Sequence, residues 1–168
     1  MTETSEKERA GVLTDIPMIR ALLFNEARLM DESRYADWLA LWAADALYWV
    51  PCNEDDADPN THVSIIYDDR ERLEQRIERL MSGSVLAVEP KPRMRRVVSN
   101  VEMYQEANGD VTVESNFILG IARSARQQLW IGRTRHSICS VGSELKIRRK
   151  KVMLINNDQE IPLLQFLI

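Results

Sequence analysis

The sequence predicts an α+β fold in which three N-terminal helices cover one face of a curved, mainly antiparallel sheet. Apolar residues recur at helical spacing in the first half of the chain, whereas the hydrophobic period changes to two after Pro92. Turn residues separate the alternating segments of the second half. Helices followed by a long meander are typical of a single sheet with helices on one side.

The first helix is expected to follow a polar N-terminal segment. Residues 1–14 lack periodicity, so we expect them to be flexible and a single domain to span residues 15–168. Asp15 is placed to cap the helix, and Pro17 lies in its first turn. Its predicted apolar face consists of Ile19, Leu22, Leu23, Ala27 and Met30.

A second, short helix is expected directly after the polar break at residues 31–33. Its predicted buried face, at i, i+3, i+4 and i+7, consists of Tyr35, Trp38, Leu39 and Trp42. Residues 47–50 are β-branched or aromatic and precede Pro51, which predicts a short strand. The acidic stretch 52–61 is rich in turn formers and predicts a loop.

The third helix is predicted over residues 70–82, with Gly83 at the C-cap position. Asp68 and Asp69 precede it, where carboxylates cap free N–H groups and interact favourably with the helix dipole. The predicted apolar face of this helix consists of Leu73, Ile77, Leu80 and Met81.

Long strands are expected beyond a linker that contains Pro90 and Pro92. The pair Asn108-Gly109 is the strongest hairpin signal in the chain, and Gly142 marks a second turn. The predicted strands cover residues 93–104, 111–121, 126–139 and 144–155. Strand alternation divides the basic runs 93–96 and 148–151 between the two faces of the sheet, and we expect these charges to be solvated.

Composition argues against several classes of protein. A formal net charge of −4 is unfavourable for a nucleic-acid binder. No apolar run reaches the roughly 18 residues of a membrane-spanning helix, and the start does not resemble a signal peptide, so we expect a soluble, cytoplasmic protein. Cys52 and Cys139 lack the number and spacing of a disulfide framework, and we interpret both as reduced packing residues.

Two motifs, DALYWVP at Asp45–Pro51 and SIIYDDR at Ser64–Arg70, resemble the small β subunit of aromatic-ring-hydroxylating dioxygenases. The similarity covers nearly the whole chain after residue 15. Its weaker segments are PRMRRVVSNVEM, SNF, GRTRH and RKKVMLINND. The turn at residues 141–145 departs from a Gly-Gly-Trp-like turn that many members carry. The resemblance implies a cone-shaped roll of the nuclear-transport-factor-2-like, or cystatin-like, type.

The resemblance also implies a role in the terminal oxygenase component of an enzyme that adds both atoms of O2 to an arene. The product in that family is a cis-dihydrodiol, and the electrons come from NADH through separate components. The large α subunit carries a Rieske [2Fe–2S] cluster and a mononuclear Fe(II). The resemblance implies that this chain is a mainly structural partner of α subunits and of other β copies in an α3β3 assembly. Naphthalene-, biphenyl- and benzoate-like substrates all stay open.

The residues themselves are consistent with a chain that lacks a catalytic, cofactor-binding or metal-binding site. No paired Cys-His motif is present for a Rieske cluster, and His62 and His136 lack the ligand spacing for mononuclear iron. No serine lies in a Gly-x-Ser-x-Gly elbow, and no glycine-rich phosphate loop opens a helix.

Residues at a subunit interface follow mainly from the resemblance. It suggests the stretch Tyr67–Arg70, and the planar guanidinium of arginine suits carboxylates across an interface. The predicted interface residues are Trp49, Tyr67, Asp68, Asp69, Arg70, Arg93 and Arg95.

Two other functions stay open at the level of sequence. A standalone dehydratase or isomerase of the same architecture would need a carboxylate, a tyrosine and a histidine that converge in a dry cone. The candidates for that chemistry are Asp45, Tyr48, His62 and Tyr67. A simple binding module would need only a ligand in the cone.

Overall fold

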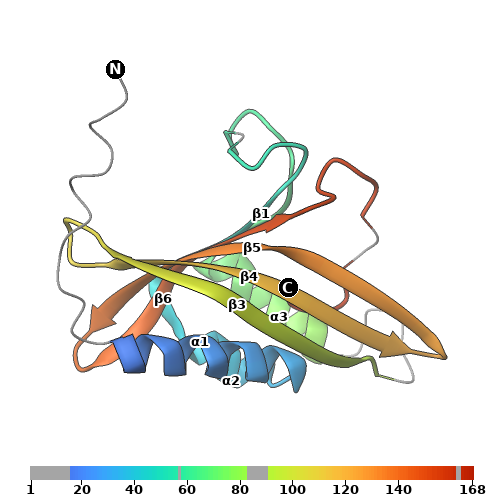
Figure 1. The fold of residues 1–168 in the computed structure, drawn as a ribbon, viewed down its shortest axis with the longest axis horizontal. Helices are drawn as coiled ribbons and strands as arrows, with labels where there is room; N and C mark the ends of the chain where they lie inside the picture. Colours follow the sequence, from blue (N-terminus) through green and yellow to red (C-terminus); the bar gives the residue numbers. More distant parts are fainter. Residues whose placement is uncertain (1–15, 57, 83–90, 162–163) are drawn as a thin grey trace.

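The computed structural model describes residues 16–56, 58–82, 91–161 and 164–168. Figure 1 shows the helices on one side of a long, twisted sheet, and a loop and a turn rising from the opposite side. The predictions for the segment 1–14, Asp15, Gly83 and Pro90 lie outside the described residues. The helices are α1 (Ile16–Asp31), α2 (Tyr35–Ala40) and α3 (Arg70–Met81).

The sheet has six strands in the order β2-β1-β6-β5-β4-β3. Neighbours are antiparallel except β1 and β6, which run parallel, so the predicted mainly antiparallel sheet with helices on one face is confirmed. The strands are β1 (Trp42–Pro51), β2 (Ser64–Asp69), β3 (Arg93–Gln105), β4 (Val111–Arg123), β5 (Arg126–Val141) and β6 (Glu144–Leu154).

Periodicity located most elements correctly. Helix α1 buries its predicted face, with Leu22 partly covered, and Asp69 caps α3 by accepting a hydrogen bond from the Arg72 N–H at 2.9 Å. The hairpin at Asn108-Gly109 is confirmed, with Gly109 at φ 89° and Asn108 accepting from the Asp110 N–H. Met81, which was expected on the buried face of α3, is 61% exposed.

The second helix and the first strand differ from the prediction. Helix α2 ends at Ala40, and Trp42 opens β1 instead of closing the helix. The cause is tertiary: the Ile147 N–H donates to the Leu41 carbonyl, and Trp42 pairs with Ile147 of β6. Periodicity alone cannot show this pairing, because the two partners lie about a hundred residues apart in sequence. Strand β2 was not predicted as an element.

The core lies between the helices and the inner face of the sheet. Trp38 of α2 packs edge-on against Trp42 and Tyr48 of β1, with ring centroids 5.0 and 5.9 Å away. Trp38 and Tyr48 are fully buried, and Leu73 and Ile77 bring α3 into the same cluster. The predicted burial of the aromatic residues therefore holds although the helix is shorter.

The basic runs are divided between the two faces, as alternation predicts, but the expectation of solvated charges is wrong for Arg96 and Lys150. Both side chains point to the inner face and are almost completely buried. Arg96 pairs with Asp31 at 2.8 Å, and its backbone N–H also donates to Asp31. A buried cation is tolerated because it has acidic and hydrogen-bonding partners.

Gly132 allows a close approach between strands and the core. A Cβ at this position would lie 2.4 Å from the Met153 carbonyl oxygen and 2.9 Å from Phe117 Cε1. We predict that Gly132→Ala lowers the free energy of unfolding by about 1–3 kcal/mol through overpacking, as measured by urea denaturation. Gly120→Ala is the matched control, because its Cβ meets nothing closer than 3.8 Å. Equal stability of the two variants would contradict this account.

Candidate functional site

A buried group of charged side chains lies between the helices and the inner face of the sheet, in the space that we call the cone. Pairing in the sheet places Lys150 of β6 between Tyr48 and His136, and α1 brings Glu26 down onto this row. Glu26 accepts a hydrogen bond from Lys150 Nζ at 2.7 Å, and one from Trp38 Nε1 at 3.2 Å. Its other carboxylate oxygen lies 3.2 Å from His136 Nε2. The result is one carboxylate that links α1 and α2 to β5 and β6.

Electrostatics keeps Glu26 ionised in spite of its burial. Burial by itself raises the pKa of Glu26, but the charges and hydrogen bonds of Lys150 and His136 together hold it well below the ordinary value. Burial also lowers the pKa of Lys150, and Glu26 opposes that shift. The ionised carboxylate therefore stabilises the fold above the ordinary carboxylate pKa, and this contribution declines as the pH falls below that range.

The last described residues fill the cone next to Tyr48, while a separate pocket of about 500 Å3 is lined by Arg123, Trp130 and Phe166. Residues 166–168 are buried, and the ring of Phe166 lies 5.5 Å from that of Trp130. The Tyr48 hydroxyl donates to the Ile168 carbonyl at 2.7 Å and accepts from its N–H at 3.2 Å, while Arg96 donates to the Leu167 carbonyl. A void of only about 20 Å3 remains beside Glu26 and His136. This space is sufficient for a single water and too small for an organic substrate.

The residues of the standalone-enzyme hypothesis do not converge. Tyr48 lies inside the cone, whereas Asp45 and Tyr67 line a basin on the outer face of the sheet. His62 is exposed in the loop after β1, where its Nδ1 lies 2.9 Å from the hydroxyl of Thr61. A shared acid–base site would need these groups within hydrogen-bond reach of one substrate.

The described residues do not fit an iron centre. They contain no group of three or more His, Cys, Asp or Glu side chains that could hold a metal ion.

The two cysteines are not paired with each other. Cys139 is buried, which raises the pKa of its thiol, and Cys52 is half-buried near the Asn157 carbonyl. Within the same part of the chain, no helix is long and apolar enough to cross a membrane.

Three of the predicted interface residues hold helix α3 in place within the chain. Asp68 pairs with Arg76, Asp69 caps α3, and Arg70 binds Glu74 and the carbonyls of Leu39 and Trp42. These contacts fix α3 against α2 and β1. Trp49, Tyr67, Arg93 and Arg95 instead lie on the outer face.

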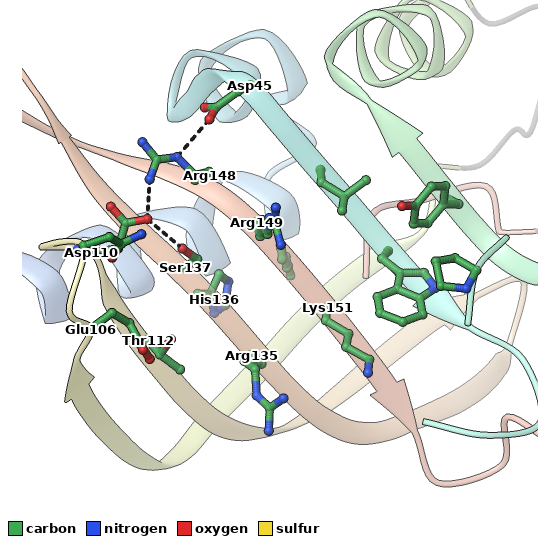
Figure 2. A pocket seen from close by; sticks show the side chains of 16 residues that line it. Asp45, Glu106, Asp110, Thr112, Arg135, His136, Ser137, Arg148, Arg149 and Lys151 are labelled. Carbon is green, nitrogen blue, oxygen red and sulfur yellow. Dashed lines mark hydrogen bonds and ion pairs between the residues drawn. The ribbon is translucent and has the colours of Figure 1, made fainter. Parts of the chain in front are cut away.

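The outer face carries an aromatic and cationic row that runs across four strands. The sheet register places Tyr67, Trp49, Lys151 and Arg135 side by side. The Tyr67 and Trp49 rings meet edge-on at 6.0 Å, and Lys151 Nζ lies 4.2 Å from the Trp49 ring centroid. These residues border a basin of about 730 Å3, which Figure 2 shows from close by.

An ion-pair chain closes the opposite end of this basin. Arg148 binds Asp45 and Asp110, and Asp110 also accepts from the Ser137 hydroxyl, as the dashed lines in Figure 2 mark. Arg149 lies between the aromatic and cationic row and this ion-pair chain, and it has no hydrogen-bond or ion-pair partner among the described residues. The basin can therefore recognise a partner through aromatic contact and charge.

Sequence reasoning missed Glu26, Lys150 and the row around Lys151 and Arg135. The available signal for Glu26 was its position in α1, three residues after Leu23 and four before Met30, on the predicted apolar face. A charged residue at such a position needs a buried partner. The identity of that partner depends on the sheet register.

We predict that Glu26→Gln lowers the free energy of unfolding by about 3–5 kcal/mol, because Lys150 is left as a buried cation without a counter-ion. Chemical denaturation of the purified chain measures this loss. The double variant Glu26→Gln with Lys150→Met should recover much of it, since both charges are removed. A double variant that is less stable than the single one would refute the proposed charge balance.

Comparisons with known proteins agree with this architecture. The family model described as the ring hydroxylating beta subunit matches residues 25–159. The chain is 34% identical over 143 residues to the small subunit of 2-halobenzoate 1,2-dioxygenase from Burkholderia cepacia, covering 82% of this chain and 86% of that protein.

Solved structures agree at the level of the fold. The crystal structure of the beta subunit of benzoate 1,2-dioxygenase from Burkholderia mallei has a TM-score of 0.75 at 30% identity, covering 88% of this chain and 95% of that one. A nuclear-transport-factor-2-like protein with a cystatin-like fold from Novosphingobium aromaticivorans has a TM-score of 0.62 at 14% identity, covering 84% and 82%, and shows the fold alone. The chain belongs to the family of ring-hydroxylating dioxygenase beta subunits.

Proposed function

We propose that this beta subunit is non-catalytic and supports iron-bearing α subunits in the terminal oxygenase component of a dioxygenase that acts on an aromatic carboxylate. Membership in the family implies an α-subunit partner. We further propose an α3β3 assembly in the cytoplasm, with the Rieske cluster and the mononuclear Fe(II) on the α subunit. NADH-derived electrons would reach the α subunit through separate components, and the product would be a cis-dihydrodiol.

The observation that carries this proposal is the filled interior around Glu26 and Tyr48. Small-molecule sites are concave and bury most of their ligand, and a volume of about 20 Å3 beside the Glu26 group does not allow this. The filling residues come from the chain itself and are held by Tyr48 and Arg96. The interior charges around Glu26 therefore serve stability, and we assign partner recognition to the exposed outer face.

Contact with the α subunit is best assigned to the aromatic part of the basin. Tyrosine, tryptophan and arginine are enriched at interface hot spots, and Trp49, Tyr67 and Arg149 line the same basin. Asp68, Asp69 and Arg70 would support this contact indirectly, by holding α3 and the end of β2 in place. We infer a single domain over residues 15–168, since helices and strands share a common core cluster.

The substrate class rests on the relatives. The curated relative is a subunit of a 2-halobenzoate dioxygenase, and the solved structure belongs to a benzoate dioxygenase. Both compounds are monocyclic aromatic carboxylates. This supports a benzoate-like substrate over naphthalene-like and biphenyl-like ones.

The direct experiment is co-expression with a large-subunit partner, followed by mass determination and iron analysis. We expect the isolated chain to contain no stoichiometric iron, and the complex to contain iron and to oxidise benzoate-type acids when reductase and NADH are supplied. An α subunit that is fully stable, assembled and active without this chain would contradict the supporting role. Turnover of naphthalene but not of benzoates would overturn the substrate class alone.

Three substitutions distinguish a supporting role from catalysis by this chain. Asp45→Asn and His62→Asn should leave the specific activity of the complex unchanged, because Asp45 lines the outer basin and His62 lies in an exposed loop, whereas Tyr48 is buried in the cone. Tyr48→Phe should lower the free energy of unfolding by about 1–3 kcal/mol, because the Ile168 backbone loses its buried partner. Loss of turnover in all three variants with unchanged stability would favour the standalone-enzyme hypothesis.

A further inference from the structure

A further candidate site is the pocket of about 500 Å3 that the β4–β5 hairpin forms with the last described residues. The hairpin extends beyond the helices in Figure 1. Its register pairs Ile121 with Gln128 and Arg123 with Arg126. Because residues two apart on a strand share a face, these pairs continue the inner-face row of the core residue Leu119. The pocket therefore lies on the helix-bearing side of the sheet, and its volume is typical of a small-molecule site.

The buried part of this pocket is aromatic. Trp130 and Phe166 both line it, and their rings meet edge-on with centroids 5.5 Å apart. Only 6% of Trp130 and 8% of Phe166 are exposed, so the surrounding core holds both rings in place. Ile121 adds to the apolar lining. A further ring can pack against such a pair, because aromatic rings attract one another edge-on or offset at about 4.5–7 Å.

The exposed rim of the pocket is cationic. Arg123 and Arg126 lie directly opposite each other on adjacent strands, where like charges are destabilising. Neither forms an ion pair with a described residue, and the guanidinium of Arg123 donates only to the Gln165 side chain, at 3.4 Å. None of the described residues that line the pocket is acidic. A bound carboxylate would relieve this repulsion, because guanidinium groups bind carboxylates in a bidentate fashion.

Acidic side chains do occur in an adjoining groove, which shares Pro92 with the pocket and is lined by Asp31 and Glu32. Both carboxylates are already engaged by other arginines. Asp31 pairs with Arg96 at 2.8 Å, and Glu32 pairs with Arg28 at 3.2 Å. The two arginines of the pocket rim are therefore not neutralised from this side.

The turn at the end of the hairpin adopts a conformation that its residues disfavour. Ser124 and Ala125 form a two-residue loop in which both have positive φ, 49° and 60°. Such loops favour Asn-Gly, which this chain has in its other hairpin, at Asn108-Gly109. Unfavourable backbone geometry is concentrated at ligand and active sites. The strained turn and the facing cations thus occur together at one pocket, which favours a role in binding.

We propose that this pocket binds a small aromatic monocarboxylate. The ring of the ligand would pack against Trp130 and Phe166, and its carboxylate would bind Arg123 and Arg126 at the rim. A few polar groups around an apolar interior is the usual composition of a small-molecule site. The inference goes beyond the proposed function, because it gives this chain a ligand of its own, on the opposite face of the sheet from the basin that we assign to partner contact.

The test is isothermal titration calorimetry of the full chain alone with sodium benzoate. We expect saturable binding with a Kd of about 1 mM or tighter. Acetate has the carboxylate without the ring, and benzyl alcohol has the ring without the charge, so each should bind at least about tenfold more weakly. No saturable binding of benzoate, or equal affinity for either of the other two compounds, would overturn the proposal.

Two neighbouring glutamines allow a matched test of the location. Gln128→Glu places a carboxylate in the pocket, where it repels the ligand and competes for the arginines, and should weaken benzoate binding by at least about tenfold. Gln127→Glu is the control, because Gln127 and Leu129 alternate to the outer face while Gln128 points inward. Both glutamines are exposed, and circular dichroism checks that both variants are folded. Equal binding by the two variants would contradict the proposed site.

Arg126→Gln removes one cation of the rim and should weaken benzoate binding by about fivefold or more. Arg20→Gln makes the same charge change at an exposed position of α1 and should leave the affinity unchanged. An equal loss in both variants would reduce the effect to net charge and overturn the role of Arg126. If benzoate does not bind but the chain still joins an active iron-bearing complex, the proposed function stands without this site.

Discussion

The fold depends on the interaction between Glu26 and Lys150 at the centre of the cone. A buried carboxylate needs cationic and hydrogen-bonding partners, and Glu26 obtains them from three separate elements. Because Lys150 and His136 lie on adjacent strands, this requirement fixes where α1 crosses the sheet. The Arg96–Asp31 pair sets a second point of attachment between the end of α1 and β3. The helix layer is thereby held in one position over the inner face.

The same arrangement supports the proposal that the chain acts through its exterior. Once α1 and its charges occupy the inner face, the last residues of the sequence fill what is left, bound by the hydroxyl of Tyr48. The part of the interior around Glu26 and Tyr48 is thereby closely packed. The outer face, in contrast, keeps an aromatic and cationic row in register across the strands. Partner recognition is the function that such a surface supports.

Much of the fold could be predicted from local patterns, because amphipathic periodicity directly reports which face of α1, α3 and β4 is buried. The beginning of β1 could not, since Trp42 fits a helical face equally well and is held in the sheet by Ile147. Strand β2 is short, and its partner is needed to define it. The function could be predicted from the family motifs. The row on the outer face could not, because it depends on the register of the sheet: its members Tyr67, Trp49, Lys151 and Arg135 come from four separate strands.

The most direct test of the account is hydroxyl-radical footprinting of the chain, alone and assembled with its large-subunit partner. If the outer face binds the partner, the side chains of Trp49, Tyr67 and Leu129 should react less with hydroxyl radicals in the assembly than in the isolated chain. The buried residues 166–168 should remain unreactive in both states. If the outer-face residues reacted equally in both states and residues 166–168 became reactive, the cone and not the sheet surface would be the functional part of this subunit.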